Sequence, residues 1–140
     1  MKTIAISGGF DPIHIGHVRL MNEAKKLGDK LIVIINNDNW LKQKKGYTFM
    51  KEEDRLEIIK NLKCVDEVFL TEHDENTQDM SVCNELNKIK PTIFANGGDR
   101  KEDNIPEYEL CNKLGIKMIF NVGGNKLRSS SELVKEAKNK

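Results

Sequence analysis

Long apolar runs and an excess of charge of one sign are missing from this 140-residue sequence. Its longest apolar run, residues 31–35, is far short of the roughly 20 residues that a membrane-spanning helix needs, so we expect no membrane association. Lysine and arginine number 23 against 22 aspartates and glutamates. A dedicated DNA or RNA binder has a clear basic excess, so the net charge of +1 predicts no nucleic-acid partner.

The sequence has only three cysteines, and their spacing matches no common disulfide or metal-binding motif. Cys64, Cys83 and Cys111 are an odd number and form no C-x-x-C motif, so we expect ordinary small apolar thiols in a reducing, cytoplasmic compartment. Residues 1–6 lead directly into a strand pattern rather than a signal peptide, which agrees with that expectation. Hydrophobic residues make up 38% of the chain, enough for one core, and we expect a single domain over residues 1–140.

Strand and helix patterns alternate along the chain. Apolar and β-branched runs predict strands at residues 3–7, 31–35, 65–70, 92–95 and 116–120. Helical spacing predicts helices at residues 15–27, 56–62, 82–89, 108–114 and 129–137, and the lysine-rich stretch 36–48 is expected to be a loop. This alternation predicts an α/β, Rossmann-like fold with a five-stranded parallel sheet and helices on both faces.

Polar residues and glycines gather where the predicted strands end. They lie at residues 7–17, 36–38, 96–100 and 123–131, whereas the strands themselves are plainly apolar. Ligands of such sheets bind beyond the carboxyl ends of the strands, where the strand order reverses. The sequence therefore predicts a binding site at this edge of the sheet.

Gly8 and Gly9 allow two readings. Backbone N–H groups without intervening side chains can cradle a phosphate, but paired glycines also make tight turns between a strand and a helix. Neither G-x-G-x-x-G nor G-x-x-x-x-G-K-[ST] occurs in the chain, which argues against a dinucleotide dehydrogenase and a P-loop ATPase.

His14 and His17 stand three residues apart at the expected start of a helix, so both imidazoles can lie on one face. Two hydrogen-bond donors beside a helix N-terminus suit a phosphate whose charge grows in a transition state. A zinc site is the rival interpretation. It lacks a third ligand nearby, because His73 is remote in sequence and the cysteines are scattered.

Residues 8–17, G-G-F-D-P-I-H-I-G-H, resemble the signature of the HxGH nucleotidyltransferase superfamily. The similarity continues through residues 25–29, 37–38, 65–68, 97–99 and 129–133, and so covers nearly the whole chain. Within the superfamily the chain resembles the cytidylyltransferase-like branches, including glycerol-3-phosphate cytidylyltransferase and the heptose-1-phosphate adenylyltransferase domain.

The resemblance implies a site, carried over position by position. Its catalytic residues would be His14, His17 and Lys44. The nucleotide would be bound by Gly8, Gly9, Phe10, Asp11, Lys42, Lys45, Arg55, Gly98, Asp99, Arg128, Ser129, Ser130 and Ser131. The acceptor would be bound by Asp11, Asp38 and Thr77, and no residue would be a dedicated metal ligand.

Several of these positions also have simpler interpretations. The lysines at residues 42–45 would lie on a mobile loop that closes on phosphates, although such a run is also typical of a solvated surface. Ser129 and Glu132 form a capping box, which is compatible with phosphate binding at the same helix N-terminus. The acidic residues 72–79 fit an acceptor with many hydroxyls or a plain solvated turn, in which Thr77 would cap the next helix.

The implied reaction is transfer of a nucleotidyl group from CTP or ATP to a small phosphomonoester such as a polyol or sugar phosphate, with release of pyrophosphate. Mg²⁺ would be bound through the triphosphate. The chain departs from the cytidylyltransferase pattern at Gly9, where a threonine is common, and at Gly124, where a terminal arginine is expected and Arg128 could compensate. Residues 96–99, N-G-G-D, are closer to the heptose branch, and the choice of base stays open.

Three alternatives remain beside this hypothesis. A non-catalytic nucleotide sensor would keep the pocket but release no pyrophosphate. The branch of archaeal FAD synthetase would use ATP and FMN. A fragment of a class I tRNA synthetase would share the H-I-G-H motif, but the chain lacks the lysine-rich signature loop and an anticodon domain. The resemblance also implies a homodimer.

Overall fold

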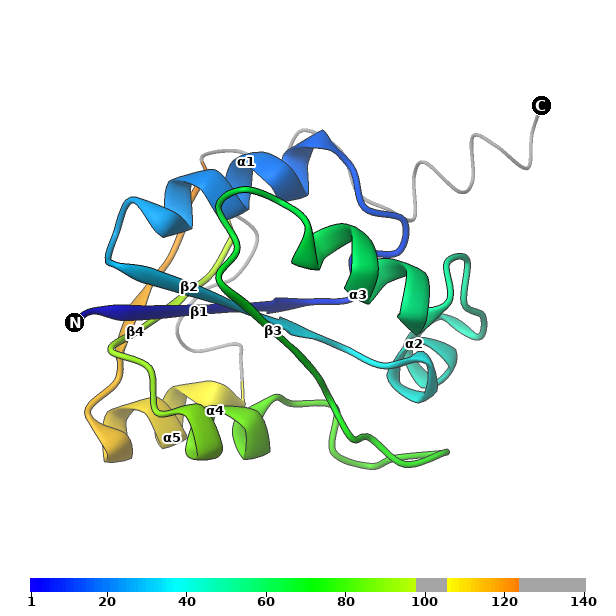
Figure 1. The fold of residues 1–140 in the computed structure, drawn as a ribbon. Helices are drawn as coiled ribbons and strands as arrows, with labels where there is room; N and C mark the ends of the chain where they lie inside the picture. Colours follow the sequence, from blue (N-terminus) through cyan, green and yellow to red (C-terminus); the bar gives the residue numbers. More distant parts are fainter. Residues whose placement is uncertain (98–105, 124–140) are drawn as a thin grey trace.

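The computed structural model describes residues 1–97 and 106–123, and within them a parallel sheet has the strand order β3-β2-β1-β4-β5 (Figure 1). The strands are β1 (Thr3–Gly8), β2 (Lys30–Ile35), β3 (Glu67–Leu70), β4 (Ile93–Ala95) and β5 (Lys117–Ile119). The helices are α1 (Ile15–Lys25), α2 (Asp38–Lys45), α3 (Glu52–Lys60), α4 (Cys83–Ile89) and α5 (Glu107–Leu114). The predicted five-stranded parallel α/β fold is confirmed.

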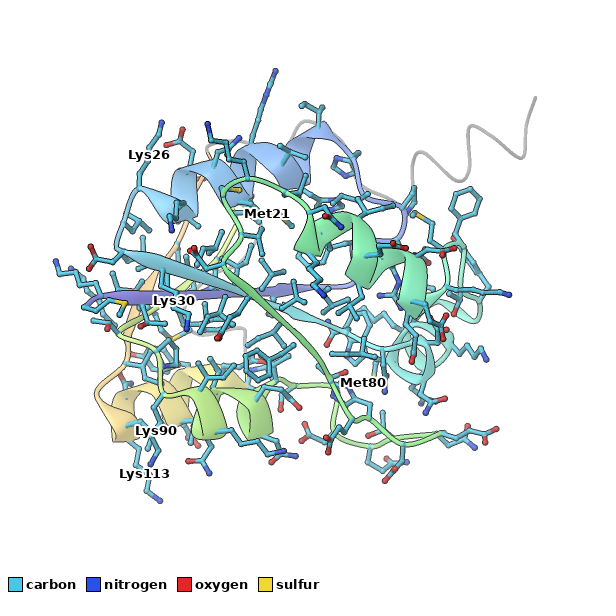
Figure 2. All side chains as sticks on the ribbon, viewed as in Figure 1. Met21, Lys26, Lys30, Met80, Lys90 and Lys113 are labelled. Atoms are coloured by element: carbon cyan, nitrogen blue, oxygen red, sulfur yellow. The ribbon has the colours of Figure 1, made fainter. Side chains whose placement is uncertain are left out.

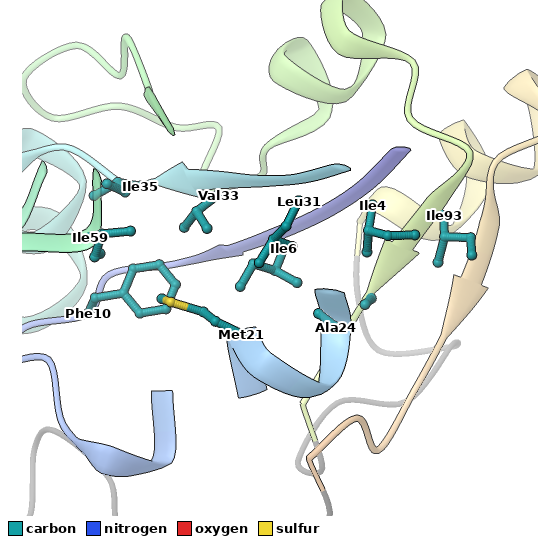
Figure 3. Packing of buried hydrophobic residues seen from close by; sticks show 11 residues of the cluster. Ile4, Ile6, Phe10, Met21, Ala24, Leu31, Val33, Ile35, Ile59 and Ile93 are labelled. Atoms are coloured by element: carbon teal, nitrogen blue, oxygen red, sulfur yellow. The ribbon is translucent and has the colours of Figure 1, made fainter. Parts of the chain in front are cut away.

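Helices cover both faces of the sheet, because β1, β2 and β4 are apolar on both sides. α1 and α3 pack on one face and α4 and α5 on the other (Figure 1). Figure 3 shows the first of the two cores, in which Phe10 and Met21 lie beneath the residues of β1 and β2. Lysines near helix ends, such as Lys26 and Lys113, project away from these cores (Figure 2).

The expectation of a loop over residues 36–48 is wrong, because eight of these residues form α2. Asn37 caps the helix by accepting a hydrogen bond from the Trp40 amide at 2.9 Å. Gly46 ends it with a φ of 86°, a left-handed conformation that glycine adopts without steric cost. The capping residues Asn37 and Gly46 could have been recognised in the sequence. The helix between them is mostly polar and buries a single apolar residue, Leu41, so it has no apolar periodicity that would predict a helix.

The strand order places the candidate site. β1 and β4 are neighbours, and the crossover that leaves β1 leads to β2 on one side, whereas the crossover that leaves β4 leads to β5 on the other side. This reversal is where open α/β sheets form their ligand crevice. The turn at residues 9–14 and the N-terminus of α1 follow immediately, and α2 lies at the same edge of the sheet (Figure 1).

The remaining boundaries agree with the predictions to within a few residues. The helix expected at residues 129–137 lies outside the described part of the chain. In the ranges that are described, no helix is both long and apolar enough to cross a membrane.

Candidate active site at the carboxyl edge of the sheet

The glycines after β1 are required by packing. A Cβ on Gly8 would lie 2.9 Å from Cζ of Phe10, and a Cβ on Gly9 would lie 2.9 Å from Cδ2 of Leu41. Both distances are too short for real side chains, so these glycines let Phe10 and Leu41 close over the turn. This close packing gives both glycines a structural role, and a phosphate cradle at the same amides stays a prediction.

His14 and His17 cap α1 through their side chains. The Gly16 amide donates to Nδ1 of His14 at 3.1 Å, and the His14 amide donates to Nδ1 of His17 at 3.2 Å. The two rings stack with their centroids 3.9 Å apart and their planes at 28°. The sequence prediction that both imidazoles lie together at the start of a helix is confirmed.

These caps decide which ring nitrogen of each histidine carries hydrogen. A nitrogen that accepts an N–H hydrogen bond bears no hydrogen itself, so both rings are neutral and have their hydrogen on Nε2. The helix N-terminus adds a partial positive charge at the same place. His14 and His17 can therefore offer Nε2–H donors to an anionic oxygen, without either ring being charged.

Phe10 packs against the His17 ring. Its ring meets the His17 ring edge-on, with centroids 5.0 Å apart and planes at 90°. Phe10 is only 4% exposed and belongs to the core under α1 (Figure 3). Phe10 therefore packs in the core and contacts the His17 ring, and its predicted contact with the nucleotide stays a prediction.

Asp11 ties the turn to the segment between α2 and α3. Its carboxylate is buried, with the residue 1% exposed, and accepts hydrogen bonds from the amides of Phe49, at 2.8 Å, and Met50. Lys45 Nζ lies 3.3 Å from the same carboxylate and donates to the Asp11 carbonyl oxygen at 2.9 Å. The Asp11 side chain is enclosed by protein donors, and its predicted contacts with nucleotide and acceptor stay predictions.

Arg55 is wholly buried, at 0% exposure, and its guanidinium side chain bonds to four other residues. It donates to the carbonyl oxygens of Gly9 (2.8 Å), Met50 (3.0 Å) and Asn36 and pairs with the Asp38 carboxylate at 2.7 Å. A buried charge needs such complete pairing. Arg55 and Asp38 therefore hold each other in place, and the predicted nucleotide contact of Arg55 and acceptor contact of Asp38 stay predictions.

The lysines of α2 separate into two groups. Lys45 is drawn inward to Asp11, whereas Lys42 and Lys44 are exposed on the helix surface. They stand on a helix rather than on the expected loop. The predicted roles of Lys42, Lys44 and Lys45 at the nucleotide stay predictions.

The loop after β3 packs on the start of α2. The side-chain amides of Asn37 and Asn39 each donate to the His73 carbonyl oxygen at 2.9 Å, and Trp40 Nε1 donates to the Met80 carbonyl oxygen at 2.8 Å. This loop therefore borders the same edge of the sheet as the histidine pair.

The expected helix cap at Thr77 is wrong. Its hydroxyl donates to the Asp79 carbonyl oxygen at 3.0 Å, and α4 begins only after Val82. Ser81 and Asp79, not Thr77, make the local hydrogen bonds just before the helix. Contact of Thr77 with an acceptor stays a prediction.

Asn36, which the sequence patterns did not single out, lies at the same edge of the sheet. It is the first polar residue after the apolar strand β2, is 4% exposed, and lies against the end of β1 through a 2.9 Å hydrogen bond from its amide to the Gly8 carbonyl oxygen. The available signal was this abrupt polar residue at a strand end.

Some predicted residues lie outside the described ranges: Gly98, Asp99, Arg128, Ser129, Ser130 and Ser131. Within residues 1–97 and 106–123 no three histidine, cysteine, aspartate or glutamate side chains gather in a way that could hold a metal. The carboxylates of Asp11 and Asp38 are already engaged by Lys45 and Arg55.

Comparison with known families decides the class of protein. The family model described as Cytidylyltransferase-like matches residues 5–136. The chain belongs to this family. The relatives of named activity are nucleotidyltransferases, and the chain is an enzyme of the same class.

Two kinds of curated relative stand out. An FAD synthase of Methanobrevibacter smithii is 36% identical over 99% of this chain and 92% of its own length, and one of Ferroglobus placidus is 39% identical over 84% and 72%. The bifunctional protein HldE of Hydrogenovibrio crunogenus is 36% identical over 88% of this chain but only 23% of its own length.

The fold has a solved counterpart. The structure of the lipopolysaccharide core biosynthesis protein from Thermoplasma volcanium superposes with a TM-score of 0.71 and 28% identity, over 91% of this cytidylyltransferase-like chain and 99% of that protein. The Rossmann-like architecture is therefore shared along nearly the whole length of both proteins.

Proposed function

We propose that this cytidylyltransferase-like enzyme transfers an adenylyl group from ATP to a small phosphomonoester, and that FMN is the first acceptor to test. The histidine pair at the N-terminus of α1 carries the proposal, because two fixed, neutral donors stand where the sheet order reverses. The similarity to FAD synthases over most of both chains supports ATP and FMN.

In the proposed reaction an oxygen of the acceptor phosphate attacks the α-phosphorus of ATP. The bond from that phosphorus to the bridging oxygen of pyrophosphate breaks, and pyrophosphate leaves with the electron pair. Such a transfer needs positioning and charge stabilisation rather than covalent catalysis. Nε2–H of His14 and His17 would donate to the oxygens on which negative charge grows, and Lys42 and Lys44 would neutralise the leaving phosphates.

Mg²⁺ would enter with the nucleotide and neutralise triphosphate charge. The paired carboxylates near the turn suit this arrangement, because Asp11 and Asp38 already have cationic partners and the phosphates would supply the ligands. Contacts from Asp99 and from Ser129 to Ser131 remain part of the proposal, as do a cytoplasmic location and a homodimer.

A sugar phosphate is the second candidate acceptor. The matching region of HldE and the resemblance of residues 96–99 to the heptose branch favour it. In that case the donor would still be a nucleoside triphosphate and the products a nucleotide sugar and pyrophosphate.

The test is pyrophosphate release from ATP or CTP in the presence of FMN, a heptose phosphate or glycerol phosphate. Release with ATP and FMN, together with FAD formation, is the expected result. Release only with CTP would contradict the adenylyl donor, and release only with a sugar phosphate would replace FMN by the second candidate.

A sensor would bind ATP without turnover under every one of these conditions. To separate the two, equilibrium ATP binding is measured beside turnover for the wild type and for His17→Ala. The proposal expects turnover to fall by orders of magnitude while the fold, judged by circular dichroism, is kept. The control is Asn22→Ala, which changes an exposed side chain on α1.

A further inference from the structure

We propose that Asn36 contacts the acceptor, and that its side-chain oxygen Oδ1 accepts a hydrogen bond from a hydroxyl group of the phosphomonoester. The inference rests on the proposed function and names the part of the acceptor that the site recognises. It makes Asn36 a specificity-determining residue in addition to the histidine pair.

The backbone of Asn36 is held from both sides. Its amide donates to the Gly8 carbonyl oxygen at 2.9 Å, and its carbonyl oxygen accepts from the buried Arg55 guanidinium. Asn36 is thereby fixed between the end of β1 and the core of the site. A side chain on such a fixed backbone can recognise a ligand with little loss of conformational entropy.

The side-chain oxygen of Asn36 lacks a hydrogen-bond donor among the described residues. Asn36 is 4% exposed, and its Oδ1 is buried and accepts no hydrogen bond from any residue in the described ranges. Buried polar atoms in native proteins nearly always have a partner, so an unpartnered one points to a partner from outside the chain, such as a water or a bound molecule. A donor supplied by a bound molecule would meet this requirement.

The position of Asn36 selects the acceptor. Alternation along β2 puts Asn36 on the same face as Ile34, and the register pairs Ile34 with Ser7 of β1, so two small polar residues share this face at the carboxyl edge. The neighbouring Asn37 is bound to Thr71 and to His73 of the loop after β3. Asn36 follows β2, on the side of β1 away from β4, and β4 is the strand followed in sequence by Gly98 and Asp99, which are expected to bind the nucleotide.

The chemistry of Oδ1 excludes the phosphoryl group as its partner. A carboxamide oxygen only accepts hydrogen bonds, and an ionised phosphate also only accepts, so the two would repel. The hydroxyls of a ribityl chain or sugar are donors. The inference therefore predicts an acceptor with a hydroxyl beside its phosphate.

The experiment compares Asn36→Ala with the wild type in steady-state kinetics. The KM for FMN should rise about tenfold, the usual size for one lost hydrogen bond, while the KM for ATP is unchanged. Asn36→Asp keeps an accepting oxygen and should restore much of the affinity. Asn87→Ala, which removes an exposed amide on α4, is the matched control and should behave as wild type.

A second arm removes the donor from the ligand. An FMN analogue whose chain carries no hydroxyls should be a poorer acceptor for the wild type but no poorer than FMN for Asn36→Ala. An unchanged KM for FMN in Asn36→Ala, or a rise in the KM for ATP instead, would overturn the inference. If Asn36→Ala does not fold, Asn36→Ser takes its place under the same criteria.

If the proposed function is wrong, the wild-type enzyme forms no FAD, and this outcome is distinct from any effect of the Asn36 variants. In that event the same comparison is made with the sugar phosphate that supports turnover and with its deoxy derivatives. A selective rise in that acceptor's KM would support the role of Asn36, and equal KM values would overturn it.

Discussion

A Cβ on Gly16 would lie 2.8 Å from Cε1 and 3.0 Å from Nδ1 of His14. Because Gly16 has no side chain, the His14 ring can lie against it while it caps α1. This contact explains in packing terms why residues 14–17 read H-I-G-H, since any side chain at position 16 would displace the ring from the Gly16 amide.

Gly16→Ala should lower turnover without the stabilisation that alanine normally brings to a helix. Alanine is favoured over glycine in helix interiors by about 1 kcal/mol, but here its methyl group would push the His14 ring out of place. The measurement combines kcat with thermal unfolding. Asn22→Ala, on the exposed surface of the same helix, is the control, and wild-type turnover in Gly16→Ala would refute the packing argument.

Substitution of His14 by two different residues should separate its capping role from its chemical role. Serine retains a side-chain acceptor for the Gly16 amide, whereas alanine loses the cap at a cost of about 0.5–2 kcal/mol. We expect His14→Ser to be more stable than His14→Ala in urea, with turnover reduced about 100-fold or more in both. Recovery of turnover in His14→Ser would mean that only the cap matters.

The three lysines of α2 should give two phenotypes. Lys45→Met should lower the free energy of unfolding by about 1–3 kcal/mol, because the buried Asp11 carboxylate loses a charged partner. Lys42→Met and Lys44→Met should leave stability within about 0.5 kcal/mol and instead raise the KM for ATP. Urea titration and kinetics of the three variants distinguish the groups, and equal stability losses would contradict the division.

Arg55→Met should be strongly destabilising, by about 3–5 kcal/mol, because it leaves the Asp38 carboxylate and three carbonyl oxygens without their donor. Arg19→Met changes an exposed arginine of α1 and should cost little. Unfolding by urea measures both. A stable Arg55→Met variant with a raised KM for ATP would contradict the structural role and favour the predicted nucleotide contact of Arg55.

Asp66 should contribute to stability in a pH-dependent way. The Lys25 ammonium, and next the Leu31 amide, lower the pKa of Asp66 below its ordinary value. Because the folded-state pKa is the lower one, the contribution is present above the unfolded pKa of about 3.9 and is lost as pH falls through the folded pKa. The stability difference between wild type and Asp66→Asn should therefore shrink below about pH 4 in urea titrations.

Glu67→Gln is the control for this pH series. Glu67 pairs with Lys30 at 2.9 Å with both side chains partly exposed, and such pairs contribute little. A difference between wild type and Asp66→Asn that stays constant from pH 7 to pH 3 would show that the Asp66 charge is not involved.

Local patterns in the sequence were sufficient for the architecture. Apolar runs and helical spacing determine the β-α alternation, because strands buried on both faces must be apolar throughout, as residues 31–35 are. The order of glycines and histidines at residues 8–17 likewise determines where α1 starts and which two imidazoles meet. These features depend on neighbours a few residues apart.

Only the tertiary structure shows which polar residues form buried hydrogen bonds within the protein. Asp11 accepts from amides 38 and 39 residues away, and Arg55 reaches a carbonyl oxygen 46 residues away. No local pattern encodes such partners, so both residues were assigned to the substrate. The same holds for Asn36, whose buried Oδ1 is apparent only when the ends of β1 and β2 are brought together. The physical reason is that burial and hydrogen-bond partners belong to the packed chain.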